Sequence, residues 1–461
     1  MWRRGVRSVA AAAVLALCTA GCATVIQSSG QYSQSRRPVS DAKVQINGLP
    51  ASGPTEADRV AGNAIADIQQ FWTEKFPQAF DGKQYQGPQG GFFSVDPGDP
   101  SESVPCVSNA SEIRGNAFYC PPRDIVAYDR VNLLPQLQEK FGPLLVGMVL
   151  AHEWGHVIQT KSGVNPDRTI VRETQADCYA GAWIRWALAG RAPHFPLDRK
   201  DLDTALAGYL LFRDPVGASA NDREAHGSGF DRISALQEGF ENDVTHCKTF
   251  DDSRKFTEIS FSQPDDQARG GNLPFEGAQG ALAVGQGDLE QTWPDVFSKT
   301  FGKELTKPKM TVLQNGEHGS CDGQEVKQAV FYCASNNTLL LAHDALKSVS
   351  DRLDGSDYAP MTLVGIGYAQ AVANQAGLSV DGADGLRRLI CLDGAYTRQV
   401  VDRPADDPRA VTLSPGDLDE AIQALLFFAG LDNYFGSRGQ FGLDRVQAYR
   451  EGFTDIQNCR R

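Results

Sequence analysis

The stretch LLVGMVLAHEWGHVIQ, from Leu144 to Gln159, decides the fold of this chain of 461 residues. Before its H-E-x-x-H motif the stretch holds no Pro and a single Gly, so its apolar run predicts a buried helix. Because residues four apart lie on one face of a helix, His152 and His156 can bind one metal ion, with Glu153 beside them as a general base. Two hydrogen-bonded core histidines are the alternative, but with only seven His in the chain this spacing favours a metal site.

The composition is that of an ordinary globular protein, with 41% hydrophobic and 22% charged residues. The length predicts two or three domains, each able to bury its own core. A formal net charge of −13, without a basic stripe, argues against a nucleic-acid partner.

Residues 1–21 have the pattern of a signal peptide. Three Arg precede an apolar run from Val9 to Ala20, which is too short to span a bilayer. The small residues before Cys22 resemble a bacterial lipobox, although Thr19 stands where Leu is usual. We therefore expect an exported lipoprotein, lipidated on Cys22 and held on the outer (periplasmic or extracellular) face of the cell membrane, with plain secretion as the alternative. Residues 22–55, rich in Ser, Gln, Gly and Pro, are expected to form a flexible tether.

Motifs of the first half of the chain recur in the same order in the second half. AFYC ending at Cys120 recurs as VFYC ending at Cys333, and GFDRISALQEGF from Gly229 recurs as GLDRVQAYREGF from Gly442. The offset is the same in both cases, which predicts a tandem duplication of one domain. The predicted division is a first domain at 56–250, a linker at 251–280 and a degenerate second copy at 281–461.

Each copy is expected to be α+β and mainly helical, with a helical core tied by disulfides. Short β-prone runs between turn residues, ahead of the motif helix, predict a small antiparallel sheet. Apolar spacing and turn signals predict four further helices in the first copy, near residues 56–76, 168–188, 202–212 and 230–243.

Of the ten Cys, all but Cys18 and Cys22 occupy matching positions in the two copies. An even number in an exported chain indicates disulfides, and the lack of any C-x-x-C argues against a metal role. Equivalent pairing in each copy predicts the bridges Cys106–Cys120, Cys178–Cys247, Cys321–Cys333 and Cys391–Cys459.

A catalytic zinc ion takes three protein ligands and leaves one position for water, so the two His need a further partner. Glu173 follows His156 at a separation that allows a turn and an antiparallel helix, which would bring its carboxylate against the motif helix. Asp177, four residues later, lies on the same face and is placed to accept a hydrogen bond from a ligand His. A solvated helix carboxylate is the alternative for Glu173.

Three motifs in order, HEWGHVIQ, ETQADCYAGAW and HGSGFDR, resemble those of the putative neutral zinc metallopeptidase family, a gluzincin-type group. The resemblance covers about residues 56–247 and implies a zincin-like fold in both copies. It also implies one Zn²⁺ per chain, with His152, His156 and Glu173 as ligands and Glu153 as the base. His226, at the head of the third motif, is expected to steady the oxyanion, with packing at a helix start as the alternative.

The second copy lacks these residues. Gln370, Ala371 and Asn374 stand in place of the two His and the base, and Leu386 and Ile390 stand in place of the two carboxylates. This copy is therefore expected to be a pseudoenzyme domain that packs against the first, holds a substrate or partner, or covers its cleft.

The leading hypothesis is a surface-anchored zinc peptidase that hydrolyses peptide bonds with a zinc-activated water and Glu153 as general base. Its expected partners are a peptide or protein substrate, the membrane through a lipid anchor, and an envelope protein through the second domain. The alternative is a non-catalytic cell-envelope scaffold or partner-binding lipoprotein that keeps a structural metal. A third hypothesis is a latent enzyme inhibited by its own second domain.

Overall fold

The computed structural model describes residues 40–222, 225–261, 264–404, 407, 412–427, 432–435 and 441–460. The predicted signal peptide, the predicted lipidation site Cys22 and most of the predicted tether lie outside the described residues. None of the described helices has both the length and the apolar character that crossing a membrane requires.

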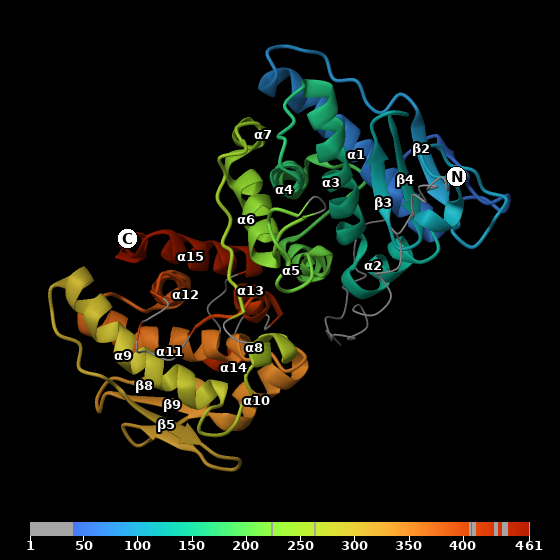
Figure 1. Ribbon diagram of the computed structural model, residues 1–461. Helices are drawn as coiled ribbons and strands as arrows, with labels where there is room; N and C mark the ends of the chain where they lie inside the picture. The colour runs from blue at the N-terminus through green and yellow to red at the C-terminus, as the bar shows by residue number, and fades with distance from the viewer. Residues whose placement is uncertain are drawn as a thin grey trace, which may run out of the picture.

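The first half of the chain, drawn in blue to green in Figure 1, sets a small sheet beside a group of helices. Its elements are β1 (Ile46–Asn47), α1 (Glu56–Ala79), β2 (Gly91–Val95), β3 (Ala117–Cys120), β4 (Ile125–Asp129), α2 (Leu133–Phe141), α3 (Pro143–Ser162), α4 (Thr169–Trp186), α5 (Arg199–Tyr209), α6 (Gly229–Asn242) and α7 (Val244–Cys247). Single 3₁₀ turns lie at Ala110–Ile113 and Leu210–Phe212, and a π turn lies at Ala187–Arg191.

The second half, in yellow to red, has a similar succession of elements. They are α8 (Pro264–Ala268), α9 (Ala281–Phe301), β5 (Lys309–Leu313), β6 (Gly319–Cys321), β7 (Gln324–Val326), β8 (Val330–Cys333), β9 (Thr338–Ala342), α10 (His343–Arg352), α11 (Tyr358–Ala376), α12 (Gly382–Val401), α13 (Asp417–Phe427), α14 (Asp432–Phe435), α15 (Gly442–Thr454) and a final 3₁₀ turn at Ile456–Arg460. The prediction of a mainly helical α+β fold is confirmed.

The prediction of an antiparallel sheet was wrong, because both main sheets are mixed. In the first half the strand order is β1-β2-β4-β3, with β2 parallel to β1 and to β4, and only β3 antiparallel to β4. A tight turn joins β3 to β4, which forces that pair to be antiparallel. The longer connection after β2 carries the chain to the far edge of the sheet, so β4 returns between β2 and β3. The order β5-β9-β8 repeats this arrangement, with β5 parallel to β9.

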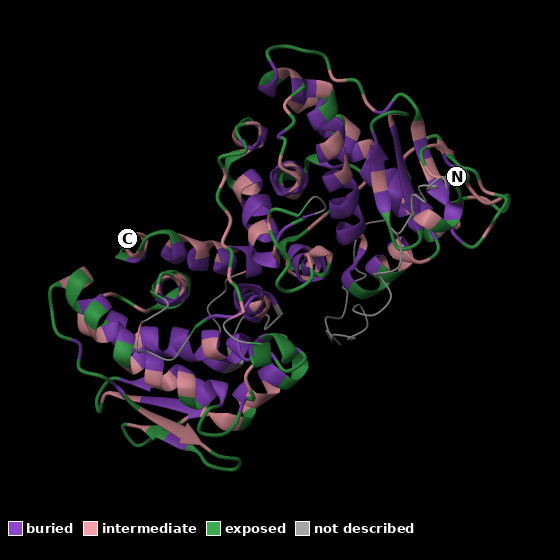
Figure 2. Cartoon of the chain, in the orientation of Figure 1, coloured by how far each residue is buried: buried purple, intermediate pink, exposed green. Residues whose placement is uncertain are grey.

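Helix α3, which carries the H-E-x-x-H motif, is buried along most of its length (Figure 2). It begins with Pro143, whose fixed φ suits the first helical position. It ends at Ser162, where Gly163 adopts the left-handed conformation (φ 79°) that commonly stops a helix. Every residue from Leu144 to His152 is buried, as expected for a helix inside a core rather than on a surface, whereas Glu153 and His156 are only partly buried.

Glycines allow the long helices of each half to cross at close range. A Cβ on Gly181 of α4 or Gly239 of α6 would lie 1.8 or 1.7 Å from a backbone carbonyl oxygen of the other helix. On α12 and α15, a Cβ on Gly394 or Gly452 would lie 2.0 or 1.7 Å from a carbonyl oxygen. Only a residue without a side chain fits at these four positions, which explains the Gly in the repeated C-x-x-G and E-G-F motifs.

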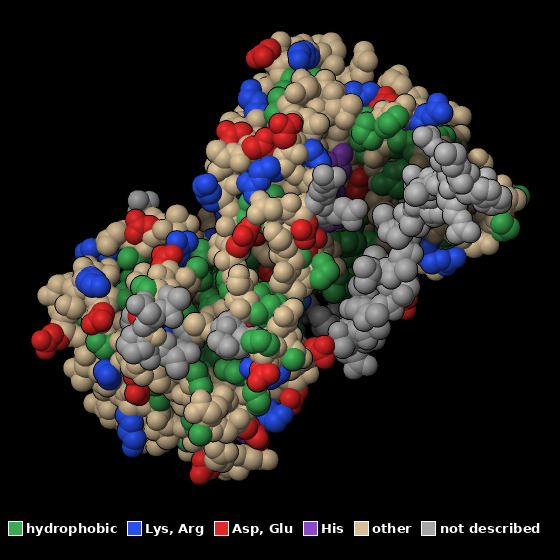
Figure 3. All heavy atoms as spheres, viewed as in Figure 1, with side chains coloured by type: hydrophobic (Ala, Val, Ile, Leu, Met, Phe, Trp, Pro, Cys, Tyr) green, Lys and Arg blue, Asp and Glu red, His purple; other side chains and the backbone are tan. Residues whose placement is uncertain are grey.

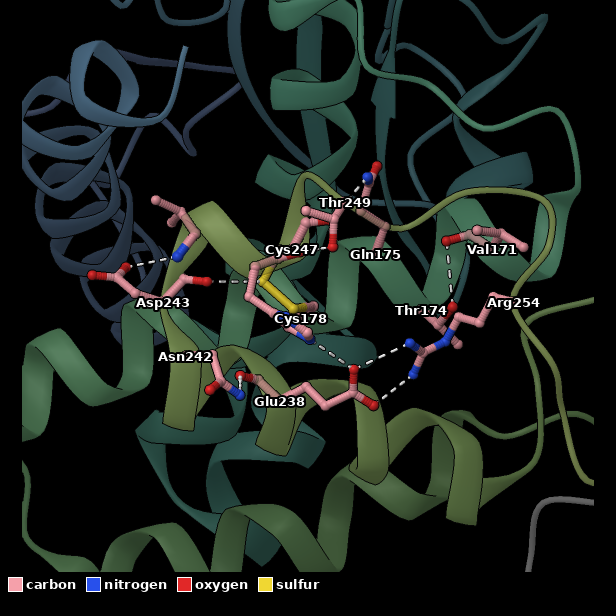
Figure 4. Close-up of a disulfide and its surroundings, with 12 residues drawn as sticks. Val171, Thr174, Gln175, Cys178, Glu238, Asn242, Asp243, Cys247, Thr249 and Arg254 are labelled. Atoms are coloured by element: carbon pink, nitrogen blue, oxygen red, sulfur yellow. Dashed lines mark hydrogen bonds and ion pairs between the residues drawn. A yellow bond between two sulfur atoms is a disulfide. The ribbon is translucent and has the colours of Figure 1, made fainter. Parts of the chain in front are cut away.

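Disulfides fix these helix pairs to the segments that follow them. The bridge Cys178–Cys247 joins the middle of α4 to the end of α7 (Figure 4). The structure contains all four pairings expected from the sequence: Cys106–Cys120, Cys178–Cys247, Cys321–Cys333 and Cys391–Cys459.

The two halves pack together through α5 and α6 on one side and α13 and α15 on the other. Asp419 on α13 pairs with Arg213 and accepts a hydrogen bond from the backbone N of Phe230 at 2.7 Å. Glu238 on α6, visible in Figure 4, pairs with Arg450 of α15 at 3.2 Å. Residues of both halves also line one cavity.

Candidate metal centre

Helices α3 and α4 bring the predicted ligands together. His152 and His156 lie one turn apart on α3, and the antiparallel α4 places Glu173 opposite them. The Nε2 atoms of His152 and His156 lie 3.1 and 3.5 Å from Oε2 of Glu173. Ligand atoms bound tetrahedrally to zinc at 2.0–2.2 Å lie about 3.3 Å apart, so this donor set fits a zinc ion.

The orientation of His152 is fixed by a buried network behind it. Its Nδ1 lies 2.7 Å from Oδ1 of Asp177, as expected from the sequence, which leaves Nε2 directed toward Glu173. Arg232 of α6 donates to both oxygens of Asp177, at 2.9 and 2.8 Å. The hydroxyl of Tyr209, at the end of α5, also donates to Asp177. Three helices therefore hold one imidazole in place.

His156 has its own support. Its Nδ1 lies 2.9 Å from Oε1 of Gln159, and the amide of Gln159 donates to the carbonyl of Arg172 at 2.7 Å and to Gln175 at 3.0 Å. Gln159 is the last residue of the opening stretch. Both His therefore use Nδ1 for protein contacts and turn Nε2 toward Glu173, as metal-binding His commonly do.

The charges of the centre favour a cation. Burial opposes the ionisation of Asp177 and Glu173, but the adjacent Arg232 and His side chains overcome it, lowering the pKa of Asp177 to about 2 and the pKa of Glu173 well below its usual value. Burial also opposes a charge on His152, yet Asp177 and Glu173 raise its pKa to about 10. Both carboxylates are thus anionic at neutral pH, and they attract positive charge to the two imidazoles.

Glu153 lies beside the two His but does not belong to the group of three metal-ligating side chains. Its Oε2 accepts a hydrogen bond from the backbone N of Tyr119 at 2.9 Å, which ties it to the edge strand β3. Burial raises the pKa of Glu153, against the opposing effect of the neighbouring His. A carboxylate with a raised pKa suits a general base when one oxygen is held and the other accepts no hydrogen bond from the described residues.

A cavity of about 1210 Å³ opens in front of these residues. Its lining includes β3, the motif helix and the turn after α5, and also Gly270, Pro415, Gly416 and Glu420 from the second half of the chain. In the space-filling view of Figure 3, His side chains in purple lie within a recess of the surface.

His226 lines the same cavity, and its side chain is 48% exposed. Its Nδ1 lies 3.4 Å from Oδ1 of Asp214, and this contact raises the pKa of His226. Asp214 also accepts hydrogen bonds from the backbone N atoms of His226 and Gly227, both at 2.7 Å. The imidazole is therefore held at the cavity wall, but it lies outside the group of three ligand side chains.

Three supporting residues were not assigned from the sequence. Arg232 and Gln159 both stand inside the quoted motifs, and a buried Arg in the apolar face of α6 is a signal of a buried carboxylate partner. Tyr209 carries no such signal, because its role depends on where α5 ends against α3 and α4.

The second half does not repeat the centre. On the described helices α11 and α12, no group of three metal-ligating side chains occurs. Leu386 and Ile390, which stand in place of Glu173 and Asp177, are fully buried in the hydrophobic core. Apolar side chains thus replace the two carboxylates, whereas Gln370 and Asn374, in place of the two His, are polar and are half-buried and exposed, respectively.

Comparison with known proteins also identifies a zinc peptidase family. A family model described as "Putative neutral zinc metallopeptidase" matches residues 4–250. An uncharacterized protein of Mycobacterium tuberculosis (strain H37Rv) is 30% identical over 172 residues, which span 32% of this chain and 58% of that protein. The uncharacterized protein YpfJ of Escherichia coli K12 is 28% identical over 220 residues, or 42% of this chain and 72% of YpfJ. No solved structure matches the chain.

Proposed function

The chain belongs to the putative neutral zinc metallopeptidase family, and from this premise we propose that its first half is a zinc peptidase with His152, His156 and Glu173 as metal ligands. The observation that carries the proposal is the convergence of these three donor atoms within 4.8 Å of one another, with Glu153 beside them in the same cavity. A buried set of two imidazoles and one carboxylate is a common catalytic zinc site.

Zinc, when bound, polarises a substrate carbonyl and brings the pKa of a bound water toward neutrality. Glu153 takes a proton from the attacking water on the oxygen that Tyr119 does not hold, and passes it to the leaving amine nitrogen. Asp177 keeps the His152 ring in the orientation that presents Nε2. His226, held by Asp214, donates a hydrogen bond to the oxyanion from the cavity wall.

A peptide is the substrate class that the cavity favours. The edge strand β3 lines the cavity over Ala117, Phe118 and Tyr119. No described strand pairs with its outer side, where the N–H of Tyr119 donates to Glu153. An extended peptide can align with such an edge by main-chain hydrogen bonds, which bring successive residues past Glu153. The cavity volume of about 1210 Å³ allows several substrate residues.

The second half, in this proposal, is a tandem copy that has lost catalysis and closes one side of the cleft. Three shared features support a duplication: the same mixed strand order, the same close glycine contacts and equivalent disulfides. We further propose that the chain is exported and anchored through Cys22, since its first residues have a signal-peptide and lipobox pattern.

Digestion of a peptide library by the purified full chain tests the peptidase proposal. We expect cleavage by the zinc-loaded protein, loss of cleavage after chelation, and recovery on adding about one equivalent of zinc. A protein that binds zinc but leaves every peptide intact would favour the scaffold alternative, in which the metal only holds α3 to α4.

A further inference from the structure

Three buried carboxylates from the second half meet where two helices begin. Asp357 immediately precedes α11, Asp417 is the first residue of α13, and Glu420 lies one turn later on α13. One carboxylate oxygen of each lies within 4.8 Å of those of the other two. The three residues are only 5% to 9% exposed, and none belongs to the centre around His152.

Local donors hold each carboxylate by one oxygen. Oδ2 of Asp357 accepts from the backbone N of Leu273 at 2.7 Å, Oδ2 of Asp417 accepts from the backbone N of Ser414 at 2.8 Å, and Oε2 of Glu420 accepts from Ser356 Oγ and Tyr358 N at 2.6 and 2.8 Å. The remaining oxygens of Asp357 and Asp417, both Oδ1, are buried and accept no hydrogen bond from the described residues. A buried carboxylate oxygen without a partner is costly, so these two oxygens indicate a ligand.

No cation of the described part of the chain is paired with the cluster. Among the described residues, no Lys, Arg or His forms an ion pair with Asp357, Asp417 or Glu420. The nearby guanidinium of Arg213 opposes the rise in the pKa of Glu420, but its ion pair is with Asp419. A fourth carboxylate, Asp266 of α8, lies beside them and accepts from Ser414 Oγ at 3.0 Å. Burial and mutual repulsion raise the pKa of Asp357 to about 6 and that of Glu420 to about 7. Either protons or a cation must therefore offset this concentration of negative charge.

We propose that Asp357, Asp417 and Glu420 bind a calcium ion. Their donors are all oxygens, which hard divalent cations prefer over the nitrogen and sulfur ligands of zinc sites. Calcium binds oxygens at 2.3–2.6 Å, so ligand atoms on opposite sides lie up to about 5 Å apart, in agreement with the spacing of this cluster. Glu420 lines the large cavity, which gives the ion a path from solvent.

The proposed ion joins segments that are distant in the sequence. Asp357 accepts a hydrogen bond from Leu273, in the segment between α8 and α9, and Asp417 accepts one from Ser414, in the turn before α13. Gly270 in that segment and Pro415 in that turn line the same cavity as Glu153. Calcium binding would therefore stabilise the wall that the second half contributes. This site does not depend on the proposed peptidase activity, and its test measures no hydrolysis.

Thermal unfolding of the full chain, stripped of metal and titrated with CaCl₂ at pH 7.5, tests the proposal. We expect the Tm of the wild type to rise by roughly 5 °C or more when calcium is in large excess over its Kd. Asp417→Asn keeps the size of the side chain but removes one charge. Without calcium it should therefore unfold at a higher temperature than the wild type, and calcium should no longer raise its Tm.

Two control variants separate this site from other effects of calcium. Asp351→Asn removes an exposed carboxylate of α10 and should keep the full calcium shift. The double variant His152→Ala/His156→Ala should also keep it, because the proposed calcium ligands lie outside the zinc centre. An unchanged Tm in the wild type, or an undiminished shift in Asp417→Asn, would overturn the proposal. The proposal would also be overturned if the Tm of the wild type rose when the pH was lowered from 8 to 6 and calcium added nothing to that rise. Protons alone would then neutralise the cluster.

Discussion

Replacing Glu153 by Gln is expected to lower kcat/KM for peptide hydrolysis by about 10²–10⁴-fold while one zinc ion per chain remains bound. The amide keeps the size of the carboxylate but cannot accept the proton of the attacking water. Glu153 is not one of the proposed metal ligands His152, His156 and Glu173, so the substitution leaves those ligands in place. Steady-state kinetics and elemental analysis of the same preparations measure the two effects.

The matched control for this substitution is Glu139→Gln on α2, where the carboxylate is exposed. This variant should hydrolyse peptides at the wild-type rate. If Glu153→Gln retained full activity with zinc bound, another group would have to serve as the base. If it lost both zinc and activity, Glu153 would be acting on the structure of the site rather than on proton transfer.

Asp177→Asn is expected to weaken zinc binding by about 10–100-fold and to lower the free energy of unfolding by about 3–5 kcal/mol. The new amide can still accept a hydrogen bond from His152, but it no longer balances the buried guanidinium of Arg232. Loss of one partner of a buried ion pair leaves the other charge uncompensated, which is the main source of the instability. Denaturant unfolding with excess chelator measures stability apart from the metal.

Asp402→Asn provides the comparison, because Asp402 forms the same kind of two-point contact with Arg398 on the exposed surface of α12. Solvent screens that pair, so its loss should leave the unfolding midpoint unchanged within measurement. Equal effects of the two substitutions would show that Asp177 contributes no more than a surface carboxylate. Wild-type zinc affinity in Asp177→Asn would contradict its role in orienting His152.

The helices of the site were predictable from the sequence because their signals are local. The apolar run, Pro143 and Gly163 define α3, and the spacing of Glu173 and Asp177 places them on one face of α4. The Cys pairs were predicted from motifs that recur in the sequence, and the structure contains the same four bridges. These features depend on near neighbours in the sequence or on a comparison of the chain with itself.

Features that depend on long-range packing were missed or wrong. Strand β4 lies between β2 and β3, and no local pattern shows that the chain returns there. Tyr209 reaches Asp177 only because α5 ends against α3 and α4. Asp357 and Asp417 are distant in the sequence, and their meeting requires the start of α13 to pack near the start of α11. Each of these contacts is set by tertiary structure rather than by periodicity.

The zinc content of the purified, dialysed full chain tests the central claim most directly, since that claim is a single zinc ion held by α3 and α4 of the first half. Elemental analysis should give about one zinc per chain for the wild type and for Glu153→Gln, because a catalytic site needs only its three protein ligands. In His152→Ala/His156→Ala, zinc should fall to background. Wild-type protein that takes up no zinc on addition, or a double variant that keeps one zinc per chain, would contradict the account.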